Sequence, residues 1–438
     1  MTETHPSVRV ASHRALAARE QIVGTYPQWE AWREQARAIK AEVIDHLDDF
    51  LEQLQRQVRS WGGEVLWAED ATQARRLILE VARRHQVQAV VKAKSMATEE
   101  INLNPALEAA GITVSETDLG EFIVQLAGNR PSHITAPALH LNREQIADLF
   151  SDRLGVRPQT DPSCLSRQGA RFLRPSFWEA QMGITGVNFA AAASGTLVML
   201  ENEGNLRLSA TVPPVHLALM GIEKIIPRLT DLEVFLRLLP ASATGQRLTA
   251  YVNFIGGLKK QPHGNQAFYL VLLDNGRRRL AAHPEWQEAL YCLRCGACLN
   301  ICPIFQLGGG HLYGQVYPGA IGILLAPFLS HGTDLTDLCT QCGACSLICP
   351  VKINLADKIA RRRAQSTRHR GLRLLMQGAA AIMARPRLYR GLEPWLRLVR
   401  QHLPATGQKY LWGPGRCLPE LAPQSYHRMM QSKQKSVS

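Results

Sequence analysis

The stretch 292–303 reads CLRCGACLNICP and the stretch 339–350 reads CTQCGACSLICP, so the chain contains one twelve-residue pattern twice. Both copies have the spacing C-x2-C-x2-C-x3-C-P, and together they hold eight of the ten cysteines. Two-residue gaps let the backbone turn back so that three thiolates converge on one iron–sulfur cube, and the proline redirects the chain after the fourth cysteine. The pattern therefore predicts two [4Fe–4S] clusters.

The repeat also predicts how the two clusters share their ligands. In two-cluster proteins with this pattern, the fourth cysteine of each block ligates the cluster of the other block. Gly296 and Gly343 are small enough to let backbone amides approach the cluster sulfides, whose hydrogen bonds tune the potential. The predicted ligands of the first cluster are Cys292, Cys295, Cys298 and Cys349, and those of the second are Cys302, Cys339, Cys342 and Cys345.

Other interpretations of the cysteines and glycines are weaker. Pairs of C-x2-C also build zinc sites, but a zinc ion needs four ligands rather than eight in two proline-closed runs. Cys164 and Cys417 stand alone and are expected to be inert thiols, with a slight claim for Cys417 as a reactive residue. No G-x-G-x-x-G follows a strand and opens a helix, so nothing indicates NAD or FAD; the glycine triplet 308–310 is interpreted as a flexible joint.

Length and composition describe the molecule that carries these blocks. A chain of 438 residues exceeds what one hydrophobic core usually organises and implies two or more domains. Hydrophobic residues make up 46% and charged residues 20%, as in ordinary globular proteins. The polar start and the absence of a long apolar stretch indicate neither export nor a membrane span. We therefore expect a cytoplasmic protein, in which clustered thiols bind metal rather than form disulfides.

The pattern of apolar residues divides the chain into four predicted regions. Residues 1–60 are expected to be a helical packing arm, with Ile39, Val43, Leu47, Leu51 and Leu54 on one face. Residues 61–280 alternate short β-branched runs with helical stretches, which indicates an α/β domain with a largely parallel sheet. Residues 281–365 form the cysteine module and residues 366–438 a basic helical region. In the α/β region, the DNG after FYLVLL at 268–273 is interpreted as a hairpin turn.

The net charge of +13 is concentrated at the C-terminal end of the chain. From Lys358 onward there are 17 Lys and Arg against two Glu, a local net charge of +15, and the remainder carries 33 basic against 35 acidic residues. Apolar residues at helical spacing lie between the arginines, at Leu388, Leu392, Trp395 and Val399. Two interpretations explain this tail equally well. It is either a surface helix packed on its own protein or a docking site for an acidic partner or an anionic membrane surface. No nucleic-acid module accompanies the charge.

The predicted test of the tail is a charge reversal. Changing Arg361, Arg362 and Arg363 to Glu should weaken association with a partner or membrane in a salt-dependent way and leave the clusters intact.

The α/β region offers a second candidate site. Polar residues follow the strand-like run AVV, where ligands of α/β proteins usually bind, and they could hold a small anion or substrate. A solvated helix start, with Ser95 as N-cap, explains the same residues equally well. His133, His140, Asn188 and Thr196 near Gly195 are weaker candidates, because a lone histidine is more often structural than catalytic. The residues of the candidate anion site are Lys92, Lys94, Ser95, Glu99 and Glu100.

Several stretches together resemble the lactate utilization protein B family. They are the segments 92–140, 183–205 and 213–227 and the two cysteine blocks, and the likeness runs from about residue 20 to beyond 400. The resemblance implies a Rossmann-like LUD domain, related to sugar-phosphate isomerases and CoA transferases, followed by an α-helical ferredoxin module and a helical tail. Family members often have an acidic residue before a T-G-T-like turn, where this chain has Ala193, which weakens any catalytic role of the α/β domain.

The resemblance implies an electron carrier in a three-protein system that oxidises L-lactate to pyruvate. The partners would be a cysteine-rich subunit and a smaller LUD subunit, with the basic tail suited to the inner face of the membrane. Iron–sulfur cubes exchange single electrons, so such a subunit lies between a substrate-oxidising partner and an acceptor. The alternative is an enzyme in its own right, in which the LUD domain is the catalytic site and the clusters exchange electrons with it.

Overall fold

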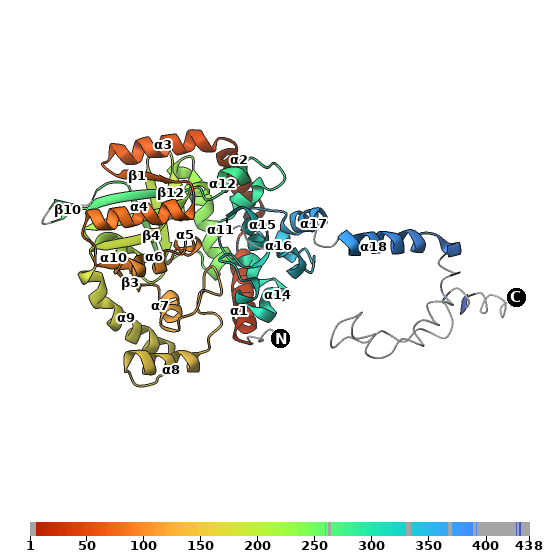
Figure 1. The fold of residues 1–438 in the computed structure, drawn as a ribbon, viewed down its shortest axis with the longest axis horizontal. Helices are drawn as coiled ribbons and strands as arrows, with labels where there is room; N and C mark the ends of the chain where they lie inside the picture. The colour runs from red at the N-terminus through yellow and green to blue at the C-terminus, as the bar shows by residue number, and fades with distance from the viewer. Residues whose placement is uncertain are drawn as a thin grey trace. The chain divides into compact units, whose positions relative to one another are not determined.

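A parallel β-sheet forms the centre of the α/β region. The computed structural model describes residues 6–258, 260–261, 264–329, 334–366, 370–388, 391, 426 and 429–430. Within them, the sheet has six strands in the order β1-β12-β7-β4-β2-β3, and every neighbouring pair is parallel (Figure 1). The strands are β1 (Glu64–Ala68), β12 (Ala267–Leu273), β7 (Val215–Gly221), β4 (Met182–Gly186), β2 (Ala89–Lys92) and β3 (Thr113–Glu116).

The sheet is apolar on both faces because both faces are covered. All seven residues of β7 are buried, which is typical of a central parallel strand and explains its nearly continuous apolar sequence. Helix α3 (Leu47–Ser60) packs on one face of the sheet, and α4 (Ala71–Arg84) and α6 (Leu103–Ala109) pack on the other. The predicted α/β class with a parallel sheet is confirmed.

A smaller four-stranded sheet, in the order β8-β5-β6-β9, lies beside the first. The turn between β5 and β6 contains Gly195, whose φ of +71° and contact with Gln57 suit a residue without a side chain. A short antiparallel pair, β10 (Lys260–Gln261) and β11 (Gly264–Asn265), completes the strands. The strands of the smaller sheet are β8 (Ile225–Ile226), β5 (Phe189–Ala191), β6 (Thr196–Glu201) and β9 (Tyr251–Ile255).

The remaining helices of the α/β region connect these strands or flank them. Side-chain caps start several helices of this region, with Asp70 before α4 and Asn142 before α8. They are α5 (Met96–Glu100), α7 (Leu119–Leu126), α8 (Arg143–Leu154), α9 (Pro162–Glu179), α10 (Asn205–Thr211), α11 (Leu232–Thr244), α12 (Arg277–Ala281), η1 (Ile222–Lys224) and η2 (Leu229–Asp231).

The N-terminal arm is helical, but the five apolar residues predicted to share one face lie on two separate helices. Helix α1 (Pro6–Val23) packs on the cysteine module and α11, and a single residue, His46, separates α2 (Trp29–Asp45) from α3. His46 breaks the helix with φ −120°, and Asp48 and Asp49 then stabilise the positive end of α3. The break lets α2 contact the cysteine module while α3 covers β1.

The predicted hairpin at DNG is also wrong. Asn275 and Gly276 adopt positive φ, but the turn leads from β12 into α12 rather than into an antiparallel strand. The Asp274 carboxylate accepts a hydrogen bond from Arg278 N in the first turn of that helix. Both neighbours of β12 in the sheet are parallel to it, and in the described residues the chain continues from β12 into helices rather than into another strand.

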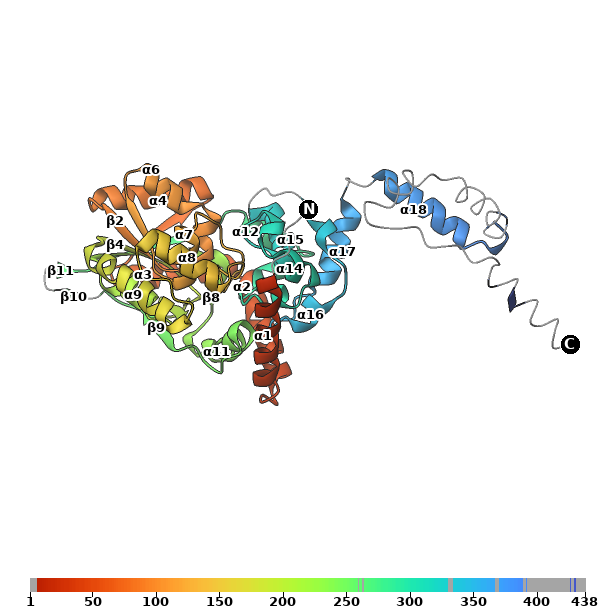
Figure 2. The same ribbon diagram turned by 90° about the horizontal axis from the view of Figure 1, so that it is seen from below.

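The cysteine module consists of short helices packed around the two cysteine blocks. Figure 2 shows α1 beside α14, in agreement with their contacts. The interpretation of the glycine triplet as a flexible joint is wrong, because all three glycines are buried and a Cβ on Gly310 would lie 1.9 Å from Ser132 O. The module contains η3 (Gln287–Tyr291), α13 (Ala297–Asn300), α14 (Pro303–Gly308), η4 (His311–Tyr313), α15 (Gly319–Leu329), η5 (Thr336–Leu338), α16 (Ala344–Ile348) and α17 (Leu355–Gln365).

Residues from Ser366 onward form a separate unit. Its helix α18 (Arg370–Met383) exposes Leu374, Leu375 and Met376. Of the predicted amphipathic residues of the tail, Leu388 is described and exposed, whereas Leu392, Trp395 and Val399 lie outside the described residues. None of the helices in the described part of the chain is both long and apolar enough to cross a bilayer.

Candidate functional site

Both cysteine blocks fold with the same local backbone. In the first block Arg294 has φ +61° and Gly296 φ +77°, and in the second Gln341 has φ +57° and Gly343 φ +79°. The left-handed residue turns its amide onto the preceding thiol: the N–Sγ distance is 3.4 Å from Arg294 to Cys292 and 3.3 Å from Gln341 to Cys339. Amide hydrogen bonds of this kind stabilise cluster sulfurs and tune their potential. The repeated sequence thus produces a repeated geometry.

The eight cysteines surround two cavities. Each cavity is lined by three cysteines of one block and the fourth cysteine of the other, which is the grouping that the sequence pattern predicts. Within the described ranges, no three His, Cys, Asp or Glu side chains are grouped to hold a lone metal ion. The first cavity is lined by Cys292, Cys295, Cys298 and Cys349, and the second by Cys302, Cys339, Cys342 and Cys345.

The two cavities differ in exposure. Cys295, Cys298 and Cys349 of the first cavity are buried, whereas Cys342 of the second is exposed together with Thr340 and Gln341. Burial and the neighbouring Cys292 raise the pKa of Cys295 to about 12, and burial and Cys339 raise that of Cys345 to about 12. Both shifts favour the neutral thiol, and bound iron would supply the positive charge that favours the thiolate. Two sets of four thiols therefore fit two [4Fe–4S] clusters.

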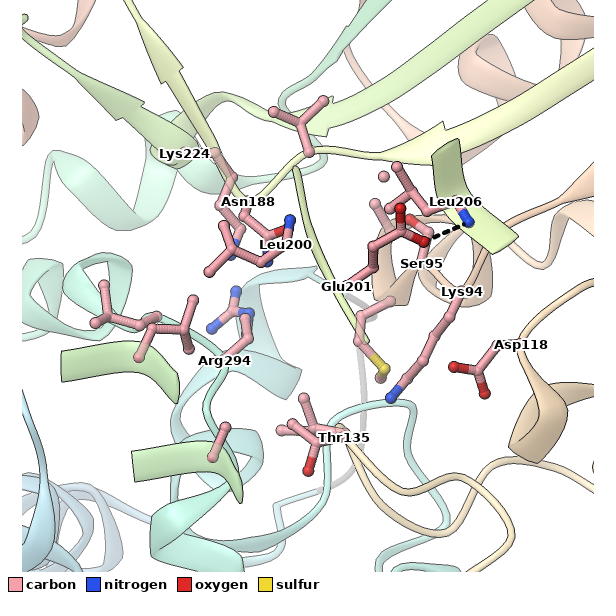
Figure 3. Close-up of a pocket in the computed structure, with 18 of the residues that line it drawn as sticks. Lys94, Ser95, Asp118, Thr135, Asn188, Leu200, Glu201, Leu206, Lys224 and Arg294 are labelled. Carbon is pink, nitrogen blue, oxygen red and sulfur yellow. Dashed lines mark hydrogen bonds between the residues drawn. The ribbon is translucent and has the colours of Figure 1, made fainter. Parts of the chain in front are cut away.

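A third cavity, of about 300 Å³, opens at the carboxyl ends of the central strands (Figure 3). Ser95 follows β2, Asn188 follows β4 and Lys224 follows β7, while Leu293 and Arg294 enter from the first cysteine block. Ligands of open α/β sheets bind at this edge, and cavities of this size hold small molecules. Leu293, Arg294 and Ile134 also line the first cysteine cavity, so the two cavities share part of one wall.

Four cationic side chains, those of Lys94, Lys224, Arg277 and Arg294, line this third cavity, which we call the α/β pocket. Figure 3 shows Arg294 pointing toward Lys224 and Asn188, while Lys94 extends toward Asp118 on the other side. The Arg294 guanidinium is stacked 4.6 Å from the Tyr317 ring centroid and pairs with Glu223 at 3.2 Å. Burial and Arg294 lower the pKa of Lys224 to about 8.

Acidic residues of the α/β pocket have other partners. Glu201 accepts hydrogen bonds from the Leu206 and Arg207 amides at 2.8 and 3.1 Å and so starts α10. Burial acts to raise the pKa of Glu223, but Arg277 and Arg294 outweigh burial and hold it at about 2. Around Arg294 and Lys224, the pocket therefore presents cations rather than carboxylates to a ligand.

The structure separates the five residues of the predicted anion site. Lys94 and Ser95 line the α/β pocket. Lys92 lies beneath α5, fully buried, where its ammonium pairs with Glu116 at 2.8 Å and Glu99 at 3.1 Å. Glu100 belongs to another buried pair, with Arg277 at 2.8 Å.

The structure also locates the weaker candidates. His133 is buried and its Nδ1 accepts from the Thr135 and Ala136 amides at 3.1 Å, while Nε2 lies 3.2 Å from Asn300 Oδ1; burial and Lys94 lower its pKa to about 3. These bonds give His133 a structural role, holding its loop to the cysteine module. His140 is likewise buried, 3.1 Å from the Ser132 hydroxyl.

Asn188 is the only one of these weaker candidates that lines the α/β pocket, whereas Thr196, Gly195 and Ala193 lie outside it. Of the lone cysteines, Cys164 accepts a hydrogen bond from Arg167 at 3.0 Å, and Cys417 lies outside the described residues. Sequence reasoning missed Arg294 and Lys224. Arg294 is hidden within a metal-binding pattern, and no periodicity marks Lys224.

This combination defines a class: an α/β LUD protein with an attached iron–sulfur module. Residues 51–278 match the LUD domain model and residues 288–353 match the 4Fe-4S dicluster domain model. The dicluster match supports two [4Fe–4S] clusters as the cofactors of the chain, as the cysteine pattern predicted.

The relatives identify the family. "Lactate utilization protein B" of Bacillus velezensis is 44% identical over 326 residues, 74% of this chain and 68% of that protein. "Uncharacterized electron transport protein YkgF" of Escherichia coli K12 is 42% identical over 362 residues, 82% of this chain and 76% of that protein. The chain belongs to the lactate utilization protein B family. A solved DUF162 family protein of Deinococcus radiodurans, 11% identical over 52% of this chain and 98% of that chain, gives a TM-score of only 0.30.

Proposed function

We propose that this chain is the iron–sulfur electron-transfer subunit of a system that oxidises L-lactate to pyruvate. The names of the relatives support the substrate and the role in electron transport. The observation that carries the proposal is the placement of the two cysteine cavities, one buried against the α/β pocket and one open to the surface. When bound, the clusters would supply one-electron exchange. Electrons could then pass between the buried first cysteine cavity and the exposed second cavity.

Residues of this chain would ligate the two clusters and influence their reduction potentials. Cys292, Cys295, Cys298 and Cys349 would ligate one cluster, and Cys302, Cys339, Cys342 and Cys345 the other. Arg33 donates to the Cys349 carbonyl at 3.0 and 2.7 Å, and Arg363 donates to the Cys339 carbonyl at 2.6 Å. These arginines fix the backbone of the ligand-bearing segments and place positive charge near the anionic sites.

The expected partners are a cysteine-rich subunit and a smaller LUD subunit. A partner would exchange electrons at the second cysteine cavity, where Cys342 and Thr340 are exposed and the neighbouring Leu347 side chain is 78% exposed. A pull-down from lactate-grown cells, with the captured proteins identified by mass spectrometry, tests this expectation.

A second proposal is that the chain is an enzyme in its own right. The α/β pocket shares part of its wall with the first cysteine cavity, so a substrate in the pocket would lie next to a cluster. A test of turnover separates the two functions. We expect the purified, cluster-loaded chain, kept anaerobic with L-lactate and an artificial acceptor, to show no turnover until the partner subunits are added. Turnover by the chain alone would contradict the carrier function and support the enzyme.

The basic tail is proposed to dock a partner or an anionic membrane. The charge reversal predicted from the sequence must be redesigned, because Arg363 supports the second cysteine block and Arg362 stacks on Trp286 at 5.9 Å. Reversing all three arginines would damage the module itself, contrary to the expectation of intact clusters.

The exposed Arg385 and Arg387 are suitable replacements for that test. Changing both to Glu should weaken binding to vesicles with anionic lipids at low salt, with a smaller effect at high salt, because exposed charges are screened. Sedimentation with neutral vesicles is the control, and iron content should stay constant. Unchanged binding to anionic vesicles would show that these charges only interact with solvent.

A further inference from the structure

The α/β pocket contains a buried cation whose hydrogen bonds are incomplete. The Arg294 side chain is 7% exposed, and its Nη2 pairs with Glu223. Its Nε and Nη1 have no hydrogen-bond partner among the described residues. An unsatisfied buried guanidinium is costly, and buried polar groups in native proteins nearly always hydrogen-bond to protein, water or a ligand.

A second cation lies beside it. Lys224 lines the same side of the α/β pocket, and the described residues give its ammonium neither a hydrogen bond nor an ion pair. Among the described residues, the carboxylate that attracts both cations is that of Glu223, and it also pairs with Arg277 at 2.5 Å. Two neighbouring cations repel each other unless an anion lies between them. An anion bound between Arg294 and Lys224 would therefore be stabilised by both charges.

The structure holds both cations in place before any ligand binds. The guanidinium of Arg294 is stacked on Tyr317, whose hydroxyl donates to Glu100 at 2.7 Å. Lys40 donates to the carbonyl oxygens of Glu223 and Ile225, the two residues that flank Lys224. Preorganised donors lose little entropy when a ligand arrives.

The rest of the α/β pocket indicates the kind of anion. Asn188 lies beside the two cations, and apolar side chains form much of the remaining wall. The planar fork of an arginine matches a carboxylate in two parallel hydrogen bonds, and an apolar wall suits a carbon skeleton. The apolar residues are Met96, Leu200, Leu206, Leu219, Leu239 and Pro240.

We propose that the α/β pocket binds a small organic carboxylate, of the 2-hydroxy or 2-oxo acid class, through Arg294 and Lys224. The choice of acid class rests on the proposed function, whereas the carboxylate site rests on the unpaired cations. Because Arg294 also lines the first cysteine cavity and its amide donates to Cys292, a ligand on its guanidinium lies next to the buried cluster site.

The repeat supplies a conservative variant for the test. Gln341 occupies in the second block the position that Arg294 occupies in the first, with nearly the same left-handed backbone. Arg294→Gln therefore introduces a residue that this backbone already accommodates elsewhere in the chain. Lys224→Met removes the second charge and nearly keeps the length of the side chain. Gln341→Ala serves as the control outside the pocket.

Isothermal titration calorimetry of the full, cluster-loaded chain tests the proposal with L-lactate, pyruvate, 2-hydroxy-4-methylpentanoate and inorganic phosphate. At least one of the three acids should bind, and Arg294→Gln and Lys224→Met should each weaken it by roughly ten- to a hundredfold, the range of a charge-assisted hydrogen bond. Gln341→Ala should bind normally.

Failure of all three acids to bind, or equal binding by both pocket variants and the wild type, would overturn the site. Binding of phosphate but none of the acids would overturn the carboxylate assignment. Iron and sulfide content of the same preparation tests the proposed function separately, because a chain without clusters contradicts electron transfer whatever the calorimetry shows. A change in the electron paramagnetic resonance (EPR) signal of one cluster on adding the acid would further support a ligand beside the first cavity.

Discussion

Cys302→Ala is expected to damage the cluster of the second cysteine block and spare that of its own block. Cys302 lies in the first block of the sequence, but it lines the cavity of Cys339, Cys342 and Cys345. A cube with three thiolates loses an iron or takes a foreign ligand, so one altered and one intact [4Fe–4S] signal should remain. Iron quantitation and EPR after anaerobic reduction measure this. Cys349→Ala should give the reciprocal result.

Double variants show which cysteines ligate the same cluster. Cys302→Ala with Cys339→Ala removes two ligands from one cavity and should leave the other cluster intact. Cys302→Ala with Cys292→Ala removes one ligand from each cavity and should damage both clusters. If the second pair instead spares one cluster, each block holds its own cluster and the proposed ligand sets are wrong. Cys164→Ala, outside both cavities, is the control and should leave iron content unchanged.

The sequence predicted those features that depend on local pattern or on repetition. Buried parallel strands need apolar side chains on both faces, so runs such as EVLWA and AVVK were recognisable, and they are β1 and β2. The cysteine grouping was predictable for another reason, since the geometry of a cube requires thiolates in a fixed spacing. The α/β class and the cluster cofactors therefore followed from the sequence.

Features that depend on long-range contacts were not predictable in the same way. Lys92 and Glu116 are far apart in sequence, but the register of β2 and β3 places them opposite each other, and their ion pair makes Lys92 structural. Arg294 reaches the α/β pocket only because the cysteine module packs against the strand ends. The helix break at His46 likewise arises because α2 and α3 cover different parts of the protein.

The second large effect concerns the buried ion pairs in the wall of the α/β pocket. Arg277 pairs with Glu100 through two hydrogen bonds of 2.8 Å and with Glu223 through one of 2.5 Å, and all three side chains are 1% exposed. These residues join α12, α5 and the segment after β7, and Tyr317 connects them to the cysteine module. Two carboxylates share one guanidinium here, so its removal leaves both charges buried without that partner.

Arg277→Met should lower the free energy of unfolding by about 3–5 kcal/mol, the cost of breaking a buried ion pair by removing one partner. Arg56→Met is the matched control, because the exposed Arg56–Glu52 pair should contribute less than about 1 kcal/mol. Urea unfolding under anaerobic conditions measures both. Adding Glu100→Gln to Arg277→Met should recover part of the loss, since it removes one of the two stranded charges. A loss no greater than that of the control, or no recovery in the double variant, would mean that water or nearby residues neutralise these carboxylates, and that the Arg277 pairs do not hold the pocket wall together.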